Sequence, residues 1–265
     1  MVNIAQTEPC TRNKVRRKWK QRKEHDLKLL SISLLALSLS GMAAHAQTDT
    51  DPAVKINLGT ADKFAVIAGA GITNTSHHTF IIGDVGSSPT CTVTGLKTSQ
   101  VKGHLYLKCS NVAAKAQKGL TVAYDQAAGA VCGTNLTGKD LGGMKLTPGV
   151  YCFSTTANLT GTLTLDGQGH PNPQWIFQIG SGLTTTTNSK VVIVRGHKGK
   201  EARGCNVYWQ VGSSATIGVG NTFIGQILAL DSITLGSGVL RGKALARNAA
   251  VSITGQETVD GPPCD

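Results

Sequence analysis

Apolar and hydroxyl residues alternate in three short segments near the C-terminus, and the segments recur at a constant interval. The segments begin eighteen residues apart and read Ala215-Thr216-Ile217-Gly218, Ile233-Thr234-Leu235-Gly236 and Val251-Ser252-Ile253-Thr254. Alternation with a period of two predicts half-buried strands, because successive side chains of a strand point to opposite faces. The constant interval predicts parallel strands in successive coils of a β-solenoid. Thr216, Thr234 and Ser252 should then form one outward column on a flat wall.

A second repeat supports this arrangement. Trp175–Gly182 is echoed by Tyr208–Ser214, with Gln178 and Gln210 thirty-two positions apart. We interpret residues 195–204, which are rich in glycine and charge, as an exposed insertion that lengthens this interval. Parallel stacking should place threonines of the earlier coils beside those of the later ones, and the Thr73-Asn74-Thr75 segment is a further candidate for the same wall. The predicted site residues are Thr162, Thr164, Thr184, Thr186, Thr216, Thr234 and Ser252.

One segment has helical rather than strand periodicity. Across residues 111–130, apolar residues recur every three or four positions, namely Val112, Ala116, Leu120, Ala123 and Ala127. This spacing predicts an amphipathic helix, and its mostly alanine stripe allows close packing against a flat sheet. Because charged residues are only 15 % of the chain and glycine is abundant, we predict a mainly β fold with this helix as a strut.

The N-terminus has the pattern of a secretory signal. Nine of the 26 Lys and Arg residues lie in residues 1–46, where a basic segment precedes the apolar run at 29–39 and Ala44-His45-Ala46. We predict a signal peptide over 1–46 and a mature domain over 47–265. The alternatives are a membrane anchor, for which the run is shorter than the ~20 residues of a spanning helix, and a nucleic-acid-binding arm, which its position before the apolar run disfavours. The rest of the chain has 17 basic and 12 acidic residues, a net charge of about +5.

Six cysteines remain once Cys10 is lost with the leader. An even number in an exported chain suggests disulfides, although six cysteines allow fifteen pairings. We expect neighbours to pair, which gives Cys91 with Cys109, Cys132 with Cys152, and Cys205 with Cys264. The alternative, a metal site, lacks any CxxC or His–Cys cluster at ligand spacing, so we expect no metal and no cofactor.

The acidic residues disfavour an enzyme. Solenoids that cleave acidic polysaccharides need clustered carboxylates or a basic cleft, whereas Asp84, Asp140, Asp166 and Asp231 are scattered singly, and no GxSxG or HExxH motif occurs. Asp84, within Gly83-Asp84-Val85-Gly86, and Asp166, directly before Gly167, follow strand-like segments beside glycine, which is typical of turn capping.

Several segments of the sequence resemble the microbial secreted ice-binding proteins, and together these segments span residues 58 to about 255. They are Leu58–Gly69, Gly83–Gly86, Leu146–Tyr151, Leu159–Asp166, Trp175–Gly180, Val207–Gly212 and Gly242–Arg247. The resemblance implies a discontinuous, right-handed β-solenoid of triangular section with one long helix alongside. It also implies an antifreeze protein that adsorbs to ice through one flat, threonine-rich face and so inhibits ice growth and recrystallisation.

A threonine array suits that function for physical reasons. Neighbouring strands lie about 4.8 Å apart and alternate residues of a strand about 6.7 Å apart, which approximates the repeat of a crystal lattice. β-Branching restricts the threonine side chain. We therefore expect an ice surface as the partner, rather than nucleic acid or, after signal cleavage, a membrane, and we expect a secreted monomer. An adhesive or carbohydrate-binding matrix protein that uses the same face is the alternative, although Trp175, Phe177, Tyr208 and Trp209 lie in apolar segments suited to the core.

Overall fold

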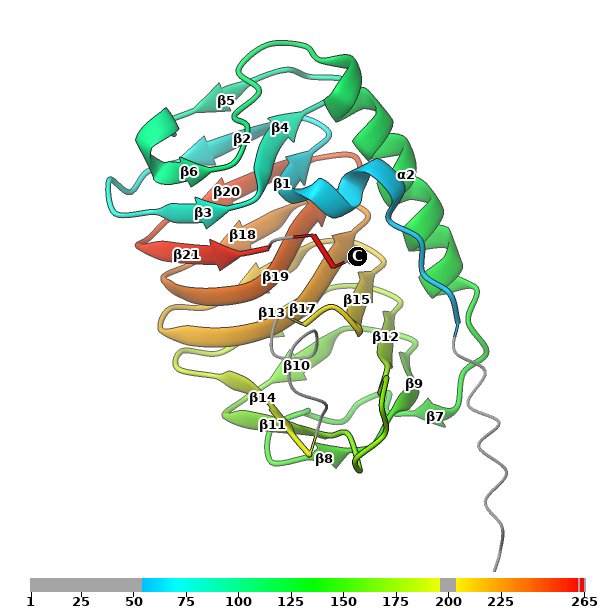
Figure 1. Cartoon of the computed structure of the whole chain (residues 1–265). Coiled ribbons are helices and arrows are strands. Elements are labelled where there is room, and N and C mark those ends of the chain that lie inside the picture. Colours follow the sequence, from blue (N-terminus) through cyan, green and yellow to red (C-terminus); the bar gives the residue numbers. More distant parts are fainter. Residues whose placement is uncertain (1–53, 196–203, 262, 265) are drawn as a thin grey trace, which may run out of the picture. The chain divides into compact units, whose positions relative to one another are not determined.

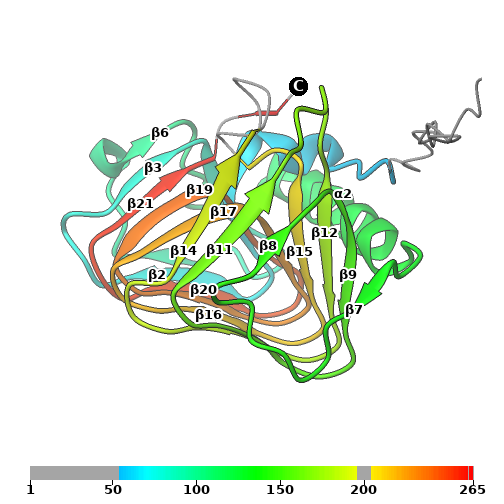
Figure 2. The same cartoon turned by 90° about the horizontal axis from the view of Figure 1, so that it is seen from below.

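Strands of the chain stack in parallel as rungs of a three-walled solenoid (Figures 1 and 2). The computed structural model describes residues 54–195, 204–261, 263 and 264. The predicted signal peptide at 1–46 and residues 196–203 of the predicted insertion lie outside the described residues. The predicted mainly β, parallel solenoid with one long helix is confirmed.

The first wall, here called the threonine face, is a separate seven-stranded sheet. Its strands in spatial order are β10 (Ala157–Leu159), β13 (Leu183–Thr185), β16 (Ala215–Ile217), β18 (Ile233–Leu235), β20 (Ala250–Ile253), β2 (Gly71–Asn74) and β5 (Val93–Thr94).

The second wall, here called the charged face, continues from the same coils around a corner. It contains β8 (Lys145–Leu146), β11 (Thr162–Asp166), β14 (Lys190–Val194), the first halves of β17 (Asn221–Ala229) and β19 (Gly238–Ala246), β21 (Glu257–Asp260), β3 (Phe80–Ile82) and β6 (Val101–Lys102).

The third wall, here called the helix-covered face, completes each coil. It contains β7 (Thr134–Asn135), β9 (Gly149–Phe153), β12 (Trp175–Ile179), β15 (Val207–Val211), the second halves of β17 and β19, β1 (Phe64–Ala68) and β4 (Asp84–Ser87). The repeat seen in the sequence is a true register here, because Gln178 and Gln210 are cross-strand partners.

Two glycines turn the corner within the long strands β17 and β19. Gly225 and Gly242 are cross-strand partners with φ of 127° and 150°, a backbone region that other residues rarely adopt. A Cβ atom on Gly225 would lie 2.5 Å from Nε1 of Trp209. Close packing of successive coils therefore requires glycine at this corner.

The solenoid is discontinuous in sequence. β1 pairs with β19 and β2 pairs with β20, so the N-terminal coils stack on the C-terminal coils (Figure 1). Helix α2 (Asn111–Ala128) then runs along the molecule to the other end, where β7 starts the next coil. The short 3-10 helices η1 (Gly59–Lys63) and η2 (Thr98–Gln100) lie within the N-terminal part.

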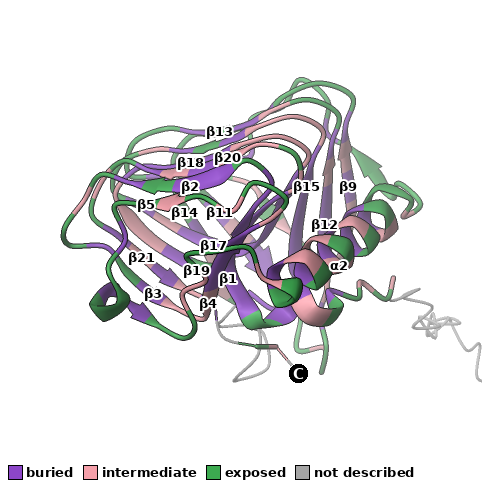
Figure 3. Ribbon diagram, turned by 90° about the horizontal axis from the view of Figure 1, so that it is seen from above, coloured by how far each residue is buried: buried purple, intermediate pink, exposed green. Residues whose placement is uncertain are grey.

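Helix α2 lies at the predicted position and begins at a capped residue. The Ser110 hydroxyl accepts a hydrogen bond from the Val112 backbone N–H, as an N-cap does. The buried stripe of the helix packs against the outer side of the helix-covered face (Figure 3), and it consists of Ala113, Ala116, Leu120, Ala123, Tyr124 and Ala127. Val112, which we predicted in this stripe, is exposed, and Ala113 occupies the contact instead.

The aromatic residues of β9, β12, β15 and β17 are buried rather than exposed as a platform. Rings of successive coils contact one another inside the solenoid: Tyr151 stacks on Phe177 and Phe177 on Trp209, with centroid distances of 5.6 Å and 3.9 Å, and Phe223 is tilted against Trp209 at 4.9 Å. Trp175 is also buried. The prediction that these aromatics belong to the core is confirmed.

All three predicted disulfides are confirmed: Cys91–Cys109, Cys132–Cys152 and Cys205–Cys264. In the part of the chain that the structure describes, no helix has the length and hydrophobicity needed to cross a bilayer.

Candidate functional site

The threonine face carries one continuous outward column along its seven strands. Strand register aligns Asn158, Thr184, Thr216, Thr234, Ser252, Thr73 and Thr94 in that order, and we call this set the central column. The predicted alignment of Thr184, Thr216, Thr234 and Ser252 is confirmed. The candidate Thr73 joins them through the pairing of β2 with β20.

Buried and mostly apolar residues flank the central column and hold it outward. Ala215 and Ile217 flank Thr216, and Ile233 and Leu235 flank Thr234; all four flanking residues are buried. Because the strand alternates, the threonine between each pair points to solvent. Figure 3 shows the same alternation of buried and accessible positions along this sheet.

The hydroxyl groups of the central column have no protein partner among the described residues. The neighbouring threonines two positions later behave differently, because their hydroxyls donate to backbone carbonyls of an adjacent coil. Thr254 donates to the Leu235 carbonyl at 3.1 Å, Thr75 to the Ile253 carbonyl at 3.4 Å and Thr186 to the Leu159 carbonyl at 3.5 Å. The central column therefore presents hydroxyls to water, whereas the edge threonines secure the turn.

The positions beside the central column are small and uncharged. Two residues before it lie Thr156, Gly182, Ser214, Ser232, Ala250, Gly71 and Thr92, and two residues after it on the first six strands lie Thr160, Thr186, Gly218, Gly236, Thr254 and Thr75. None of these side chains carries a charge or an aromatic ring. Among the described residues, these positions therefore hold no long charged side chain that would keep a mobile hydration shell.

Glycine interrupts the set of positions two residues after the central column, here called the edge column, for a structural reason. A Cβ atom on Gly218 would lie 2.7 Å from the Thr185 carbonyl oxygen, and one on Gly236 would lie 2.9 Å from the Gly218 carbonyl oxygen. The coils approach too closely at this corner for a threonine. This explains why the array is less regular than a repeated Thr-x-Thr pattern.

An acidic residue bounds the column at its lower end. Asp140 forms a bridge with Asn158 in the next register position. Its carboxylate accepts hydrogen bonds from the backbone N–H groups of Gly142 and Thr160 and from the Thr160 hydroxyl. Although burial opposes ionisation, these bonds lower the pKa of Asp140. The uncharged array thus ends at a fixed negative charge.

Two predicted site residues lie elsewhere. Thr162 and Thr164 belong to β11 in the charged face, where Thr162 pairs with Lys190 and Thr164 with Lys145. The expectation that they add a rung to the threonine column is wrong. Gly161, with φ of 85°, turns the chain after β10, so the same coil contributes Asn158 to the threonine face. Thr186 lies on the threonine face but in its edge column.

The charged face differs in chemistry along its whole length. Its outward positions include Lys102, Lys145, Lys190, Arg195, Arg241 and Asp260. At one end, Asp166 accepts hydrogen bonds from Arg195 and forms an ion pair with Lys145 at 2.9 Å. These partners, Arg195 first, hold the pKa of the Asp166 carboxyl well below its ordinary value.

The predicted turn-capping role is confirmed for Asp166, which accepts a hydrogen bond from the Gln168 backbone N–H at 3.0 Å. It is wrong for Asp84, which begins β4 and instead accepts from the His104 backbone N–H of the adjacent coil at 2.9 Å. In the described ranges, no group of three or more His, Cys, Asp or Glu residues is placed to hold a metal ion.

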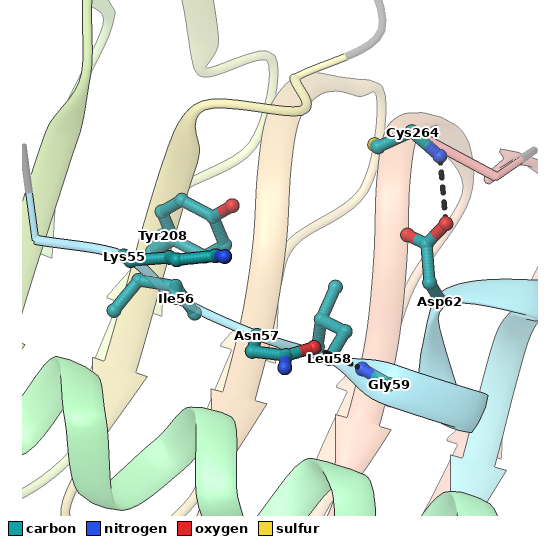
Figure 4. A pocket seen from close by; sticks show the side chains of 8 residues that line it. All are labelled: Lys55, Ile56, Asn57, Leu58, Gly59, Asp62, Tyr208 and Cys264. Atoms are coloured by element: carbon teal, nitrogen blue, oxygen red, sulfur yellow. Dashed lines mark hydrogen bonds between the residues drawn. The ribbon is translucent and has the colours of Figure 1, made fainter.

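A cavity of about 250 Å³ lies away from the threonine face, where the N-terminal segment crosses the solenoid (Figure 4). It is lined by Lys55, Ile56, Asn57, Leu58, Gly59, Asp62, Tyr208 and Cys264. The Asp62 carboxylate accepts the Cys264 backbone N–H at 2.9 Å, which ties the C-terminal segment to η1.

Comparison with known proteins identifies the family. Residues 66–259 match the sequence profile of the family described as Ice-binding-like. The chain belongs to this family. An ice-binding protein of Nostoc sp. (strain HG1) is 46 % identical over 209 residues, which cover 78 % of this chain and 75 % of the relative. One from Leucosporidium sp. (strain AY30) is 31 % identical, covering 83 % and 88 %.

Solved structures of this family share the fold. The crystal structure of an ice-binding protein from an Antarctic biological consortium is 37 % identical, with a TM-score of 0.67, and covers 77 % of this chain and 89 % of its own. The ice-binding protein of an Arctic yeast, described for its antifreeze activity, is 29 % identical, with a TM-score of 0.72 and coverage of 79 % and 95 %.

Proposed function

We propose that this protein is a secreted ice-binding and antifreeze protein that adsorbs to ice through the threonine face. The proposal agrees with the family of the chain and with the names of its relatives. One observation carries the choice of face. The central column is a straight run of seven outward polar residues whose side chains make no hydrogen bond within the described residues.

The adsorption follows from geometry and rigidity. Neighbouring rungs lie about 4.8 Å apart, so the column offers hydroxyls at a regular interval. Each threonine also presents a methyl group on a side chain with restricted χ1. Each contact with an ordered water is weak, and binding is favourable only if the array is already rigid, since immobilising flexible side chains opposes it. Buried coils and three disulfides supply that rigidity.

The other two walls are less suited to this role. Helix α2 covers one of them. The charged face carries lysine and arginine side chains, and the lysine ammonium groups are strongly hydrated on flexible stems, so they would compete with an ordered water lattice. A sugar-binding function of the threonine face would gain from exposed aromatic rings, but the aromatic ladder lies inside the solenoid. The proposed action needs no catalytic group, and adsorption requires only a monomer.

Two matched double variants test the face assignment. Thr216→Lys with Thr234→Lys should abolish the shaping of ice crystals by the purified protein, because two charged chains interrupt the column. Thr222→Lys with Thr258→Lys places the same charges at outward threonines of the charged face and should leave shaping intact. Circular dichroism and thermal melting verify that both variants are folded. Normal shaping of ice by the folded Thr216→Lys and Thr234→Lys double variant would show that the ice-binding site lies on another wall.

A further inference from the structure

The central column contains two positions without threonine. Ser252 lies between Thr234 and Thr73 in the middle of the face, and Asn158 occupies the lowest rung beside Thr184. Both residues are in strict register with the threonines. Their side chains therefore face the same surface with different chemistry.

Serine keeps the hydroxyl of threonine but lacks the methyl group that restricts its orientation. Without a γ-methyl group, the Ser252 side chain has a free choice of χ1 and presents no apolar group to the surface. Asparagine is longer and carries an amide with two donors and an acceptor, so its pattern of water contacts differs from that of a hydroxyl. Each position interrupts the repeat of methyl and hydroxyl groups.

The two interruptions differ in their consequences because of where they lie. Ser252 divides the threonines into a run of three (Thr184, Thr216, Thr234) and a run of two (Thr73, Thr94). A threonine at position 252 would join these runs into one of six. A threonine at position 158 would only lengthen one end, next to the charge of Asp140.

We infer that Ser252 limits the affinity of the threonine face for ice, and that Asn158 limits it to a smaller extent. This inference rests on the proposed function. It makes position 252 a determinant of strength rather than a requirement for binding. A single substitution at position 252 should therefore raise the affinity of the protein for ice.

The scaffold accepts the change. Ser252 is partly exposed, as is Thr234 on the adjacent strand in the same register, so an added methyl group has the surroundings that Thr234 already has. Threonine also suits strands better than asparagine does. The variants are thus expected to fold, and a gain of activity cannot arise from damage to the fold.

The experiment compares Ser252→Thr, Asn158→Thr and their combination with the unmodified protein. The measurements are the fraction of protein taken up by a slowly growing ice hemisphere and the thermal hysteresis at matched concentrations. Ser252→Thr should raise the affinity about twofold, which corresponds to roughly 0.4 kcal/mol. Asn158→Thr should give a smaller gain, and the double variant should exceed both.

The matched control creates the same run on the other wall. Val239 lies between Thr222 and Thr258 on the charged face, so Val239→Thr produces three threonines in register there. It should give no gain. An unchanged affinity of Ser252→Thr, or an equal gain from Val239→Thr, would overturn the inference. Loss of shaping in the Thr216 and Thr234 double variant would still stand as support for the face, so the two proposals fail separately.

Discussion

The threonine face and the charged face are built by the same coils, yet the outward side chains of the first are uncharged and those of the second include lysine, arginine and aspartate. β16 contributes Thr216 to one and, a few residues later, β17 contributes Thr222 to the other. Thr222 has Lys190 on one side and Val239 on the other, whereas Thr216 has threonine on both sides. The backbone repeat is common to both walls. A column of uncharged polar residues on all seven strands, rather than threonine itself, distinguishes the proposed site.

The first prediction tests whether the face continues across the junction of the N-terminal and C-terminal coils. Thr73→Lys should reduce affinity for ice about tenfold, or roughly 1.4 kcal/mol, because it places a charge within the column two rungs above Thr234. Phe80→Lys adds the same charge to the charged face of a neighbouring N-terminal strand and should have no such effect. Uptake into growing ice measures both. Equal uptake of the two variants would confine the site to the C-terminal coils.

The second prediction separates stability from binding. Glu257 begins β21 in the charged face but is buried, and burial raises its pKa to about 8. The folded state therefore holds a proton that the unfolded state releases near its ordinary pKa. The resulting stability is complete below the unfolded pKa and is lost as pH rises through about 8. Between pH 5 and pH 9, the free energy of unfolding should fall by roughly 4 kcal/mol.

Glu257→Gln provides the control for this prediction, because it removes the titrating group and keeps the size of the side chain. Denaturant melts across the same pH range should lose most of this slope, while ice shaping at pH 7 stays unchanged. A slope that persists in the variant would assign the pH dependence to other groups.

The third and smallest effect lies within the threonine face. Thr184→Ala removes a hydroxyl with no protein partner among the described residues and should lower thermal hysteresis about twofold. Thr186→Ala, two residues later, removes a hydroxyl that contacts Leu159 and Ser189 and should cost less activity but more thermal stability. Equal losses of hysteresis would mean that the edge column contributes as much as the central column does.

Much of the architecture follows from the sequence because the coils repeat. The eighteen-residue interval is one complete turn of the solenoid, so Thr216, Thr234 and Ser252 align as predicted. The helix and the disulfides are likewise confirmed. Alternation reports which residues of a strand face outward, and these segments show it clearly.

Alternation does not report to which wall of the solenoid a strand belongs. For this reason the prediction that Thr162 and Thr164 join the threonine column is wrong. Leu163-Thr164-Leu165 has the same apolar-hydroxyl-apolar pattern as Ala215-Thr216-Ile217, and only the turn at Gly161 separates its wall from the threonine face. The extension of the central column to Thr94 depends on the pairing of β2 with β5, which the sequence does not show. The sequence also does not show that the Thr186 hydroxyl bonds a backbone carbonyl whereas the Thr184 hydroxyl does not.

The most direct test of the face assignment is a comparison of Thr216→Lys with Thr258→Lys in ice-affinity uptake at equal protein concentration. Both residues point outward from the middle of parallel strands, and they differ in the wall that carries them. Exclusion of the first variant from growing ice, together with normal incorporation of the second, is the predicted result. Normal incorporation of folded Thr216→Lys, or exclusion of Thr258→Lys instead, would contradict the assignment of ice binding to the threonine face.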